Sequence, residues 1–118
     1  MNNYYQDLII WQRSMDLVEE VYHLVKYLPN EEKFALSEQI RRAAVSIPLN
    51  IAEGRSRRTH KEWIHFLSIA AGSKSELETQ LLICCRLGYL NENQIEKSMK
   101  YCDEISRMIY VLIHKPTK

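Results

Sequence analysis

The amino-acid sequence predicts an all-α fold, an antiparallel up-and-down four-helix bundle in which residues 1–118 form a single domain. Apolar residues recur at helical spacing in four segments, and helix-capping and helix-breaking residues separate these segments. No stretch of useful length alternates between apolar and polar residues as a strand does. We place the helices at roughly 7–28, 31–57, 60–87 and 92–114. Their short connections predict that successive helices are antiparallel neighbours.

The first helix carries two apolar rows, whereas a surface helix needs only one. We therefore expect it to be packed on two sides. It ends before Pro29, because proline cannot continue the hydrogen-bond ladder. One row consists of Trp11, Met15, Val18, Tyr22 and Val25, and the other of Ile10, Leu17, Val21, Leu24 and Leu28.

The second helix is expected to begin at an N-cap on Asn30, with Glu31 and Glu32 at the positive end of the helix dipole. Pro48 lies inside its pattern and removes one backbone donor, which predicts a kink in one helix rather than two helices. Gly54 is interpreted as a loosening of the helix or its end. The predicted core stripe is Leu36, Ile40, Ala43, Ala44, Ile47 and Ile51.

Two capping boxes are predicted, Thr59 with Glu62 before the third helix and Asn91 with Gln94 before the fourth. Gly88 fits a left-handed cap at the end of the third helix, and Pro116 ends the fourth. The third helix has its core stripe at Trp63, Leu67, Ala70, Leu77, Leu81 and Cys84. The fourth has Ile95, Met99, Cys102, Ile105, Ile109 and Leu112.

Composition argues against disorder and against a membrane protein. Apolar residues make up 46% and charged residues 26% of the chain, and no apolar run approaches the ~20 residues of a bilayer-spanning helix. The first six residues lack the pattern of a secretion signal, so we expect a cytoplasmic protein. The three cysteines, two of them adjacent, are expected to be reduced core thiols.

The net charge of +1 is unevenly distributed. Residues 31–61 contain seven Lys and Arg against four Asp and Glu, a local charge of +3. This excess predicts a basic patch, although the whole chain is far less basic than a dedicated nucleic-acid-binding protein.

Polar residues flank the core stripes of the second and third helices. Such a row predicts a hydrogen-bonded seam, either between helices or between subunits. The alternative is a groove for a polar ligand or nucleic acid. The residues assigned to the seam are Gln39, Ser46, Asn50, Glu53, Ser73 and Glu76.

Basic residues crowd the turn between the second and third helices. Cations and free N–H groups at a helix N-terminus form a reasonable phosphate-binding surface, and an ordinary solvated loop is the alternative. Arg41 and Arg42 lie about 20 Å along the second helix, so one nucleic-acid backbone could touch both groups. The candidate nucleic-acid-binding residues are Arg41, Arg42, Arg55, Arg57, Arg58 and Lys61.

No combination of residues predicts catalysis, a cofactor or a metal. His60 and His65 are five residues apart rather than the four that place two imidazoles on one metal ion. Glu53 and Glu76 could meet across two helices as an acid–base pair, but no nucleophile, phosphate loop or cofactor motif accompanies them. We expect a protein that is not an enzyme.

The segment from Gln39 to Gly54, QIRRAAVSIPLNIAEG, closely resembles the signature of the bacterial four-helix bundle family also called 23S rRNA intervening-sequence proteins. The resemblance continues at 7–12, 66–67, 71–73, 76–81 and 87–90. It implies an up-and-down bundle that assembles into a homopentameric ring, often encoded within segments inserted into large-subunit ribosomal RNA genes, with no established enzymatic activity.

The family also resembles the accessory variability proteins of diversity-generating retroelements, which have the same bundle and ring and bind nucleic acid and a reverse transcriptase. Two hypotheses follow for this chain. It is an oligomeric scaffold that binds structured RNA weakly, or it is a protein-interaction module for a partner such as a reverse transcriptase. The arginines of this chain stand beside Glu53, Glu76 and Glu78, which argues for weak rather than strong binding of nucleic acid.

Overall fold

The computed structural model describes residues 4–115, and these form the four-helix bundle that the sequence predicts. The expected helix stop at Pro116 lies outside the described residues. Short 3-10 turns precede α1, follow it, and occupy part of the α1–α2 connection. The helices are α1 (Ile9–Leu24), α2 (Leu36–Arg55), α3 (His60–Arg86) and α4 (Glu92–His114).

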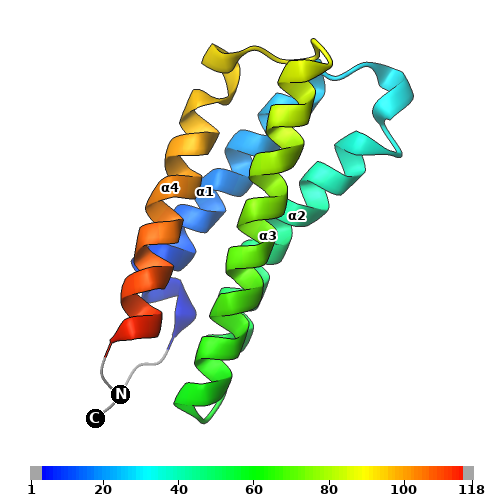
Figure 1. The fold of residues 1–118 in the computed structure, drawn as a ribbon. Coiled ribbons are helices and arrows are strands. Elements are labelled where there is room, and N and C mark those ends of the chain that lie inside the picture. Colours follow the sequence, from blue (N-terminus) through cyan, green and yellow to red (C-terminus); the bar gives the residue numbers. More distant parts are fainter. Residues whose placement is uncertain (1–3, 116–118) are drawn as a thin grey trace.

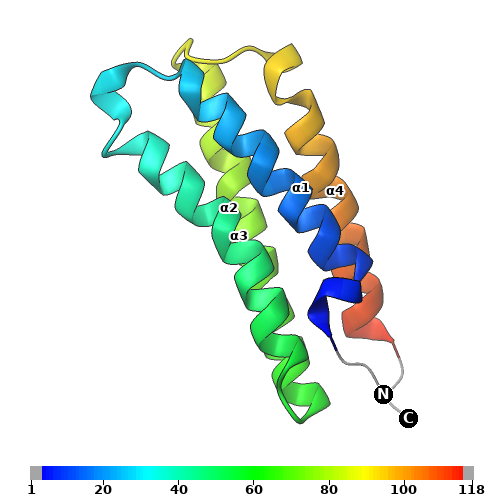
Figure 2. The same cartoon turned by 180° about the vertical axis from the view of Figure 1, so that it is seen from behind.

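The four helices form an elongated bundle with a square cross-section (Figure 1). Helix α1 lies beside α2 and α4, and α3 also lies beside α2 and α4. The α2–α3 contact is the most extensive of the four. Viewed from behind, α1 and α2 lie in front (Figure 2). The α2–α3 turn lies at one end of the bundle, and the α1–α2 and α3–α4 connections lie at the other. The α1/α2 pair and the α3/α4 pair therefore form two opposite sides of the bundle.

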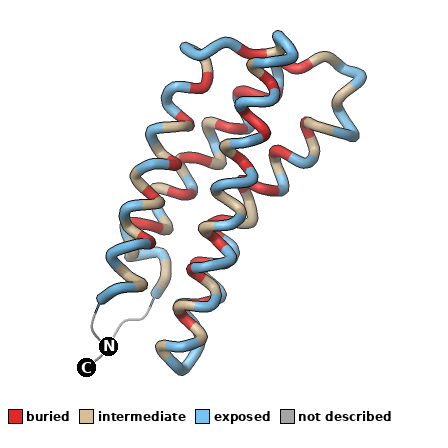
Figure 3. Tube along the Cα trace, in the orientation of Figure 1, coloured by how far each residue is buried: buried red, intermediate tan, exposed pale blue. Residues whose placement is uncertain are grey.

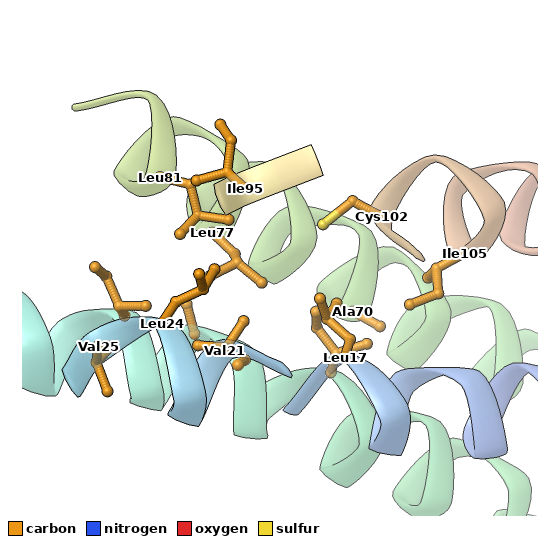
Figure 4. Packing of buried hydrophobic residues seen from close by; sticks show 14 of the residues in the cluster. Leu17, Val21, Leu24, Val25, Ala70, Leu77, Leu81, Ile95, Cys102 and Ile105 are labelled. Atoms are coloured by element: carbon orange, nitrogen blue, oxygen red, sulfur yellow. The ribbon is translucent and has the colours of Figure 1, made fainter. Parts of the chain in front are cut away.

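The core runs along the inner faces of all four helices (Figure 3). Leu17, Leu67 and Ile105 are fully buried. Figure 4 shows side chains of α1, α3 and α4 directed into the space between the helices, with the Cys102 thiol among them. The predicted stripes of α2, α3 and α4 are all buried or half-buried, which confirms them.

The two apolar rows of α1 have different environments. The row that begins at Ile10 is buried, as predicted. In the other row only Val25 is buried, whereas Trp11 and Val18 are half-buried and Met15 and Tyr22 are exposed. The single chain thus covers one row and leaves most of the second open along α2.

The predicted start of α2 was wrong. The segment Asn30–Glu32 forms a 3-10 turn, Asn30 makes no capping hydrogen bond, and α2 begins only at Leu36. Glu32 supplies the cap instead, because its carboxylate accepts a hydrogen bond of 3.3 Å from the Leu36 amide. The same carboxylate accepts a hydrogen bond of 2.8 Å from the Tyr89 hydroxyl, which joins this turn to the α3–α4 connection.

Gly54 does not loosen α2. It is a buried helical residue, and the helix continues to Arg55. A Cβ atom at this position would lie 2.7 Å from Cβ of Phe66 and 2.9 Å from the Trp63 ring. Glycine is thus required because α2 and α3 approach closely here. Pro48 lies within one continuous helix, as expected.

The ends of α3 and α4 follow the sequence signals closely. Gly88 has φ +81°, and the Tyr89 amide donates to the Cys84 carbonyl at 2.9 Å, which completes a Schellman motif. Asn91 and Gln94 form the predicted capping box. At Thr59 the box is altered, because its hydroxyl bonds to the Glu62 carboxylate at 3.0 Å while also accepting from the Glu62 amide at 3.1 Å.

Helix α1 is shorter than its predicted range of 7–28. The α-helical part ends at Leu24, and a 3-10 turn, Val25–Tyr27, carries the chain to Pro29. Helix α2 likewise ends two residues before the predicted 57. Helices α3 and α4, which follow strong capping residues, begin at residues 60 and 92, as the sequence predicts.

Candidate nucleic-acid interface

The α2–α3 turn brings four of the six predicted nucleic-acid-binding residues together at one end of the bundle. The close packing at Gly54 and the Thr59 cap fix the two helix ends that carry them. Three of them, Arg55, Arg57 and Arg58, line a surface hollow of about 200 Å³. The hollow is lined by Gly54, Arg55, Arg57, Arg58, Thr59, His60 and Trp63.

Arg57 is partly neutralised within the chain. Its guanidinium lies 2.7 Å from the Glu53 carboxylate and 3.9 Å from that of Glu62. It also lies over the Phe66 ring, 5.1 Å from the centroid. These contacts hold the side chain against the bundle and reduce its attraction for a phosphate.

Arg55, at the start of the same turn, lies against the Trp63 ring. Its guanidinium carbon is 5.7 Å from the centroid of the buried Trp63 ring, and its Nε is buried without a hydrogen-bond partner among the described residues. A cation held over an aromatic face keeps its charge while losing side-chain freedom. Arg55 therefore contributes fixed positive charge beside the hollow.

Arg58 and Lys61 are exposed, and among residues 4–115 neither takes part in an ion pair. Lys61 belongs to the first turn of α3, where backbone N–H groups have no partner within the helix. The N-terminal end of a 27-residue helix adds a favourable dipole for an anion. These two cations are the groups most available to a phosphate.

Arg41 and Arg42 lie apart from the turn, about 20 Å along α2. Arg42 pairs with Glu38 at 3.4 Å on the surface, and Arg41 lies 5.9 Å from the Tyr22 ring centroid. The structure therefore separates the six predicted residues into a cluster of four and a distant pair.

The six residues of the predicted polar seam fall into two groups in the structure. Ser46 of α2 and Ser73 of α3 share a hydrogen bond of 2.8 Å between their hydroxyls. The Asn50 amide donates to the Ser46 hydroxyl at 3.0 Å and to the Ser46 carbonyl at 2.8 Å. These three residues form a hydrogen-bonded contact between α2 and α3.

The other three seam residues, Gln39, Glu53 and Glu76, are exposed. The Glu53 carboxylate pairs with the Arg57 guanidinium at 2.7 Å. Their part in a contact between subunits stays a prediction.

The sequence predicts Trp63 as a core residue, but it does not predict that the rings of Trp63 and Phe66 lie beneath the arginines. Trp63 and Phe66 stand in the first two turns of α3, and their spacing of three residues places them on one helix face. Arg55 and Arg57 cover these rings, which leaves them unavailable for stacking on bases. The interface consequently offers charge rather than base recognition.

Within residues 4–115, no group of three or more His, Cys, Asp or Glu is placed to hold a metal ion. None of the described helices is both long enough and apolar enough to span a membrane.

Comparison with known proteins supports a single assignment. The family model of the 23S rRNA-intervening sequence protein matches residues 6–111. A similar solved structure is a protein of unknown function from the S23 ribosomal protein family of Bacteroides thetaiotaomicron VPI-5482. It shares 29% sequence identity and a TM-score of 0.83, over 91% of this chain and 100% of that one. No curated protein matches. Since the family model covers most of its length, this chain belongs to the 23S rRNA-intervening sequence protein family.

Proposed function

We propose that this protein is a non-catalytic, homo-oligomeric scaffold that makes weak, salt-sensitive contacts with structured RNA through the α2–α3 turn. The observation that carries this proposal is a pair of exposed cations, Arg58 beside Arg55 in the α2–α3 turn and Lys61 in the first turn of α3. The family's name and the resemblance to its ring-forming members support RNA association and a homopentamer.

The contact is weak for each chain because the local charge is small. Arg57 is engaged by Glu53 and Glu62, and the whole chain has a net charge of only +1. Phosphate contacts add to affinity through counterion release, so a few cations give binding that is lost as salt rises. In a closed ring the same turn is repeated by symmetry, and several weak contacts act together on one RNA.

A binding titration tests the proposal directly. The full chain is titrated with a fluorescently labelled 23S rRNA hairpin at 50 mM and 200 mM salt. Binding at the lower concentration and its loss at the higher one are expected. Arg58→Glu combined with Lys61→Glu is expected to lower affinity at least tenfold at 50 mM salt.

A matched control separates the site from net charge. Lys26→Glu combined with Lys33→Glu makes the same charge change at two exposed positions at the opposite end of the bundle. This control is expected to retain most of the binding. Absence of RNA binding at 50 mM salt, or equal losses in both double variants, would contradict the proposal.

A second candidate function is an accessory subunit that binds a protein such as a reverse transcriptase. The apolar row left open on α1 and the exposed Leu49 of α2 favour a protein contact on that face. Gene neighbourhood separates the two functions. A neighbouring reverse transcriptase gene with a variable repeat favours the accessory subunit, and a location within a ribosomal RNA gene favours the RNA scaffold.

A further inference from the structure

Two opposite sides of the bundle, α1/α2 and α3/α4, carry surfaces of opposite charge, and each surface includes exposed apolar residues. The basic face, on α1 and α2, consists of Tyr22, Arg41, Arg42, Val45, Ser46 and Leu49 around a hollow of about 480 Å³. The acidic groove, between α3 and α4, has a volume of about 530 Å³. Its principal residues are Leu82, Glu92, Glu96, Met99, Lys100 and Asp103.

We infer that the basic face of one copy of this chain binds the acidic groove of the next copy, which gives a head-to-tail interface between subunits. This inference rests on the proposed homo-oligomer and specifies which surfaces form it. It also reassigns Arg41 and Arg42 from the RNA-binding residues to the subunit interface.

Both surfaces expose apolar side chains that a partner subunit would bury. Leu49 is 63% exposed and Tyr22 43% exposed on the basic face, and Leu82 is 51% exposed at the acidic groove. A second apolar hollow of about 320 Å³ adjoins the basic face through Val45 and Leu49, and the open row of α1 lines it. Burial of such side chains drives association in proportion to the apolar area covered.

Charge decides how two copies meet. Two basic faces in contact would oppose four arginines, and two acidic grooves would oppose six carboxylates against two lysines. Like charges in contact cost several kcal/mol and exclude such partners. Contact between unlike faces instead opposes Arg41 and Arg42 to Glu92 and Glu96, and of the three arrangements it is the one in which the opposed charges attract.

The existing ion pairs do not prevent the contact. Arg42 pairs with Glu38 at 3.4 Å, and Lys100 with Glu96 at 3.8 Å, and each of the four side chains is at least 43% exposed. Exposed pairs of this kind contribute little to stability, so a partner surface can replace them. Glu92 is exposed and, within the described residues, takes part in no ion pair.

The geometry also determines the kind of assembly. The basic face and the acidic groove lie on opposite sides of the bundle, as Figures 1 and 2 show for the helix pairs that carry them. An interface between two different surfaces repeats from copy to copy and forms a ring when the rotation closes. It does not stop at a two-fold dimer.

Charge reversal with sedimentation velocity tests the inference on the full chain. The first variant carries Arg41→Glu and Arg42→Glu, and the second carries Glu92→Lys and Glu96→Lys. Each is expected to raise the concentration at half-assembly at least tenfold. A chain with all four substitutions restores opposite charges and is expected to assemble within about threefold of the unmodified protein. The control, Arg58→Glu with Lys61→Glu, changes cations outside both surfaces and is expected to assemble normally.

A neutral substitution gives an independent readout. Leu49→Ser is expected to weaken assembly, whereas Leu87→Ser, at an exposed leucine lining neither surface, is expected not to. Circular dichroism confirms that each variant is folded.

The outcomes separate this inference from the proposed function. If the unmodified chain assembles and either reversed variant assembles equally well, this interface is wrong and the oligomer stands. Failure of the four-substitution chain to recover, while it remains helical, also overturns the pairing of the two faces. If the unmodified chain is itself a monomer, the proposed oligomer fails and the inference with it.

Discussion

Gly54 of α2 and Phe66 of α3 approach so closely that a Cβ atom on Gly54 would lie 2.7 Å from Cβ of Phe66. Replacement of an interior helical glycine by alanine ordinarily stabilises a helix by about 0.5–1 kcal/mol. Here we expect Gly54→Ala to destabilise the protein by about 1–3 kcal/mol, because Phe66 Cβ cannot move without its backbone. Urea unfolding followed by circular dichroism measures the difference.

Gly72 provides the matched control. It is an exposed helical residue with no atom within 4 Å of a Cβ placed on it. Gly72→Ala is therefore expected to stabilise α3 by about 0.5–1 kcal/mol. If both substitutions shift stability in the same direction, close packing at Gly54 is not what distinguishes the two positions.

The hydrogen bond between Ser46 and Ser73 is the clearest polar link between α2 and α3. Single replacements by alanine, together with the double replacement, form a double-mutant cycle. We expect a coupling of about 0.5–1.5 kcal/mol in the free energy of unfolding. A coupling near zero would mean that this hydrogen bond adds nothing measurable to the stability of the α2–α3 contact.

Burial of the core thiols predicts a dependence of stability on alkaline pH. Desolvation raises the pKa of Cys84 from 9.0 to about 11 and that of Cys102 from 9.0 to about 12. The unfolded chain therefore loses these protons first as pH rises, and stability that is complete below pH 9 falls between pH 9 and about 12. Each thiol steepens the decline by up to about 1.4 kcal/mol per pH unit.

Urea unfolding at pH 8 and pH 10.5, with reductant present, measures this decline. Other groups also titrate in that range, so the informative comparison is with Cys102→Ala, whose decline should be shallower. Equal declines in the two proteins would show that the Cys102 thiol does not contribute.

Removal of the Glu53 charge is expected to strengthen RNA binding. The Glu53 carboxylate lies 2.7 Å from the Arg57 guanidinium, and Glu53→Gln removes the closer of the two carboxylates that pair with this cation. Glu62 remains, at the longer distance of 3.9 Å, so Arg57 becomes more available to a phosphate. One added phosphate contact raises the magnitude of the log–log salt slope by about 0.7–0.9. The titration described above measures both quantities. If Glu53 belongs to a subunit seam instead, the same substitution weakens assembly and leaves the salt slope unchanged.

The sequence predicted those parts of the fold that depend on local interactions. Asn91 and Gln94 cap α4 by bonds within four residues, and its predicted bounds, 92–114, match the structure. The start of α2 was misplaced by five residues because its cap, Glu32, is held by Tyr89, 57 residues further along the chain. No pattern of neighbouring residues contains that information.

The candidate site was predictable in the same measure. The cluster of arginines in one turn follows from the sequence, and so does their distance from Arg41 and Arg42. The environment of each charge could not be predicted from the sequence, because the rings beneath Arg55 and Arg57 belong to another helix, α3. Likewise, the function of Gly54 is a contact between helices, which its position near a helix end conceals.

The proposed RNA contact and the inferred interface both depend on assembly of the chain with itself. The molar mass in solution, measured by light scattering at micromolar concentration and 100 mM salt, tests this most directly. We expect a single species at about five times the chain mass of 14.0 kDa. A species at 14.0 kDa under these conditions would contradict the account.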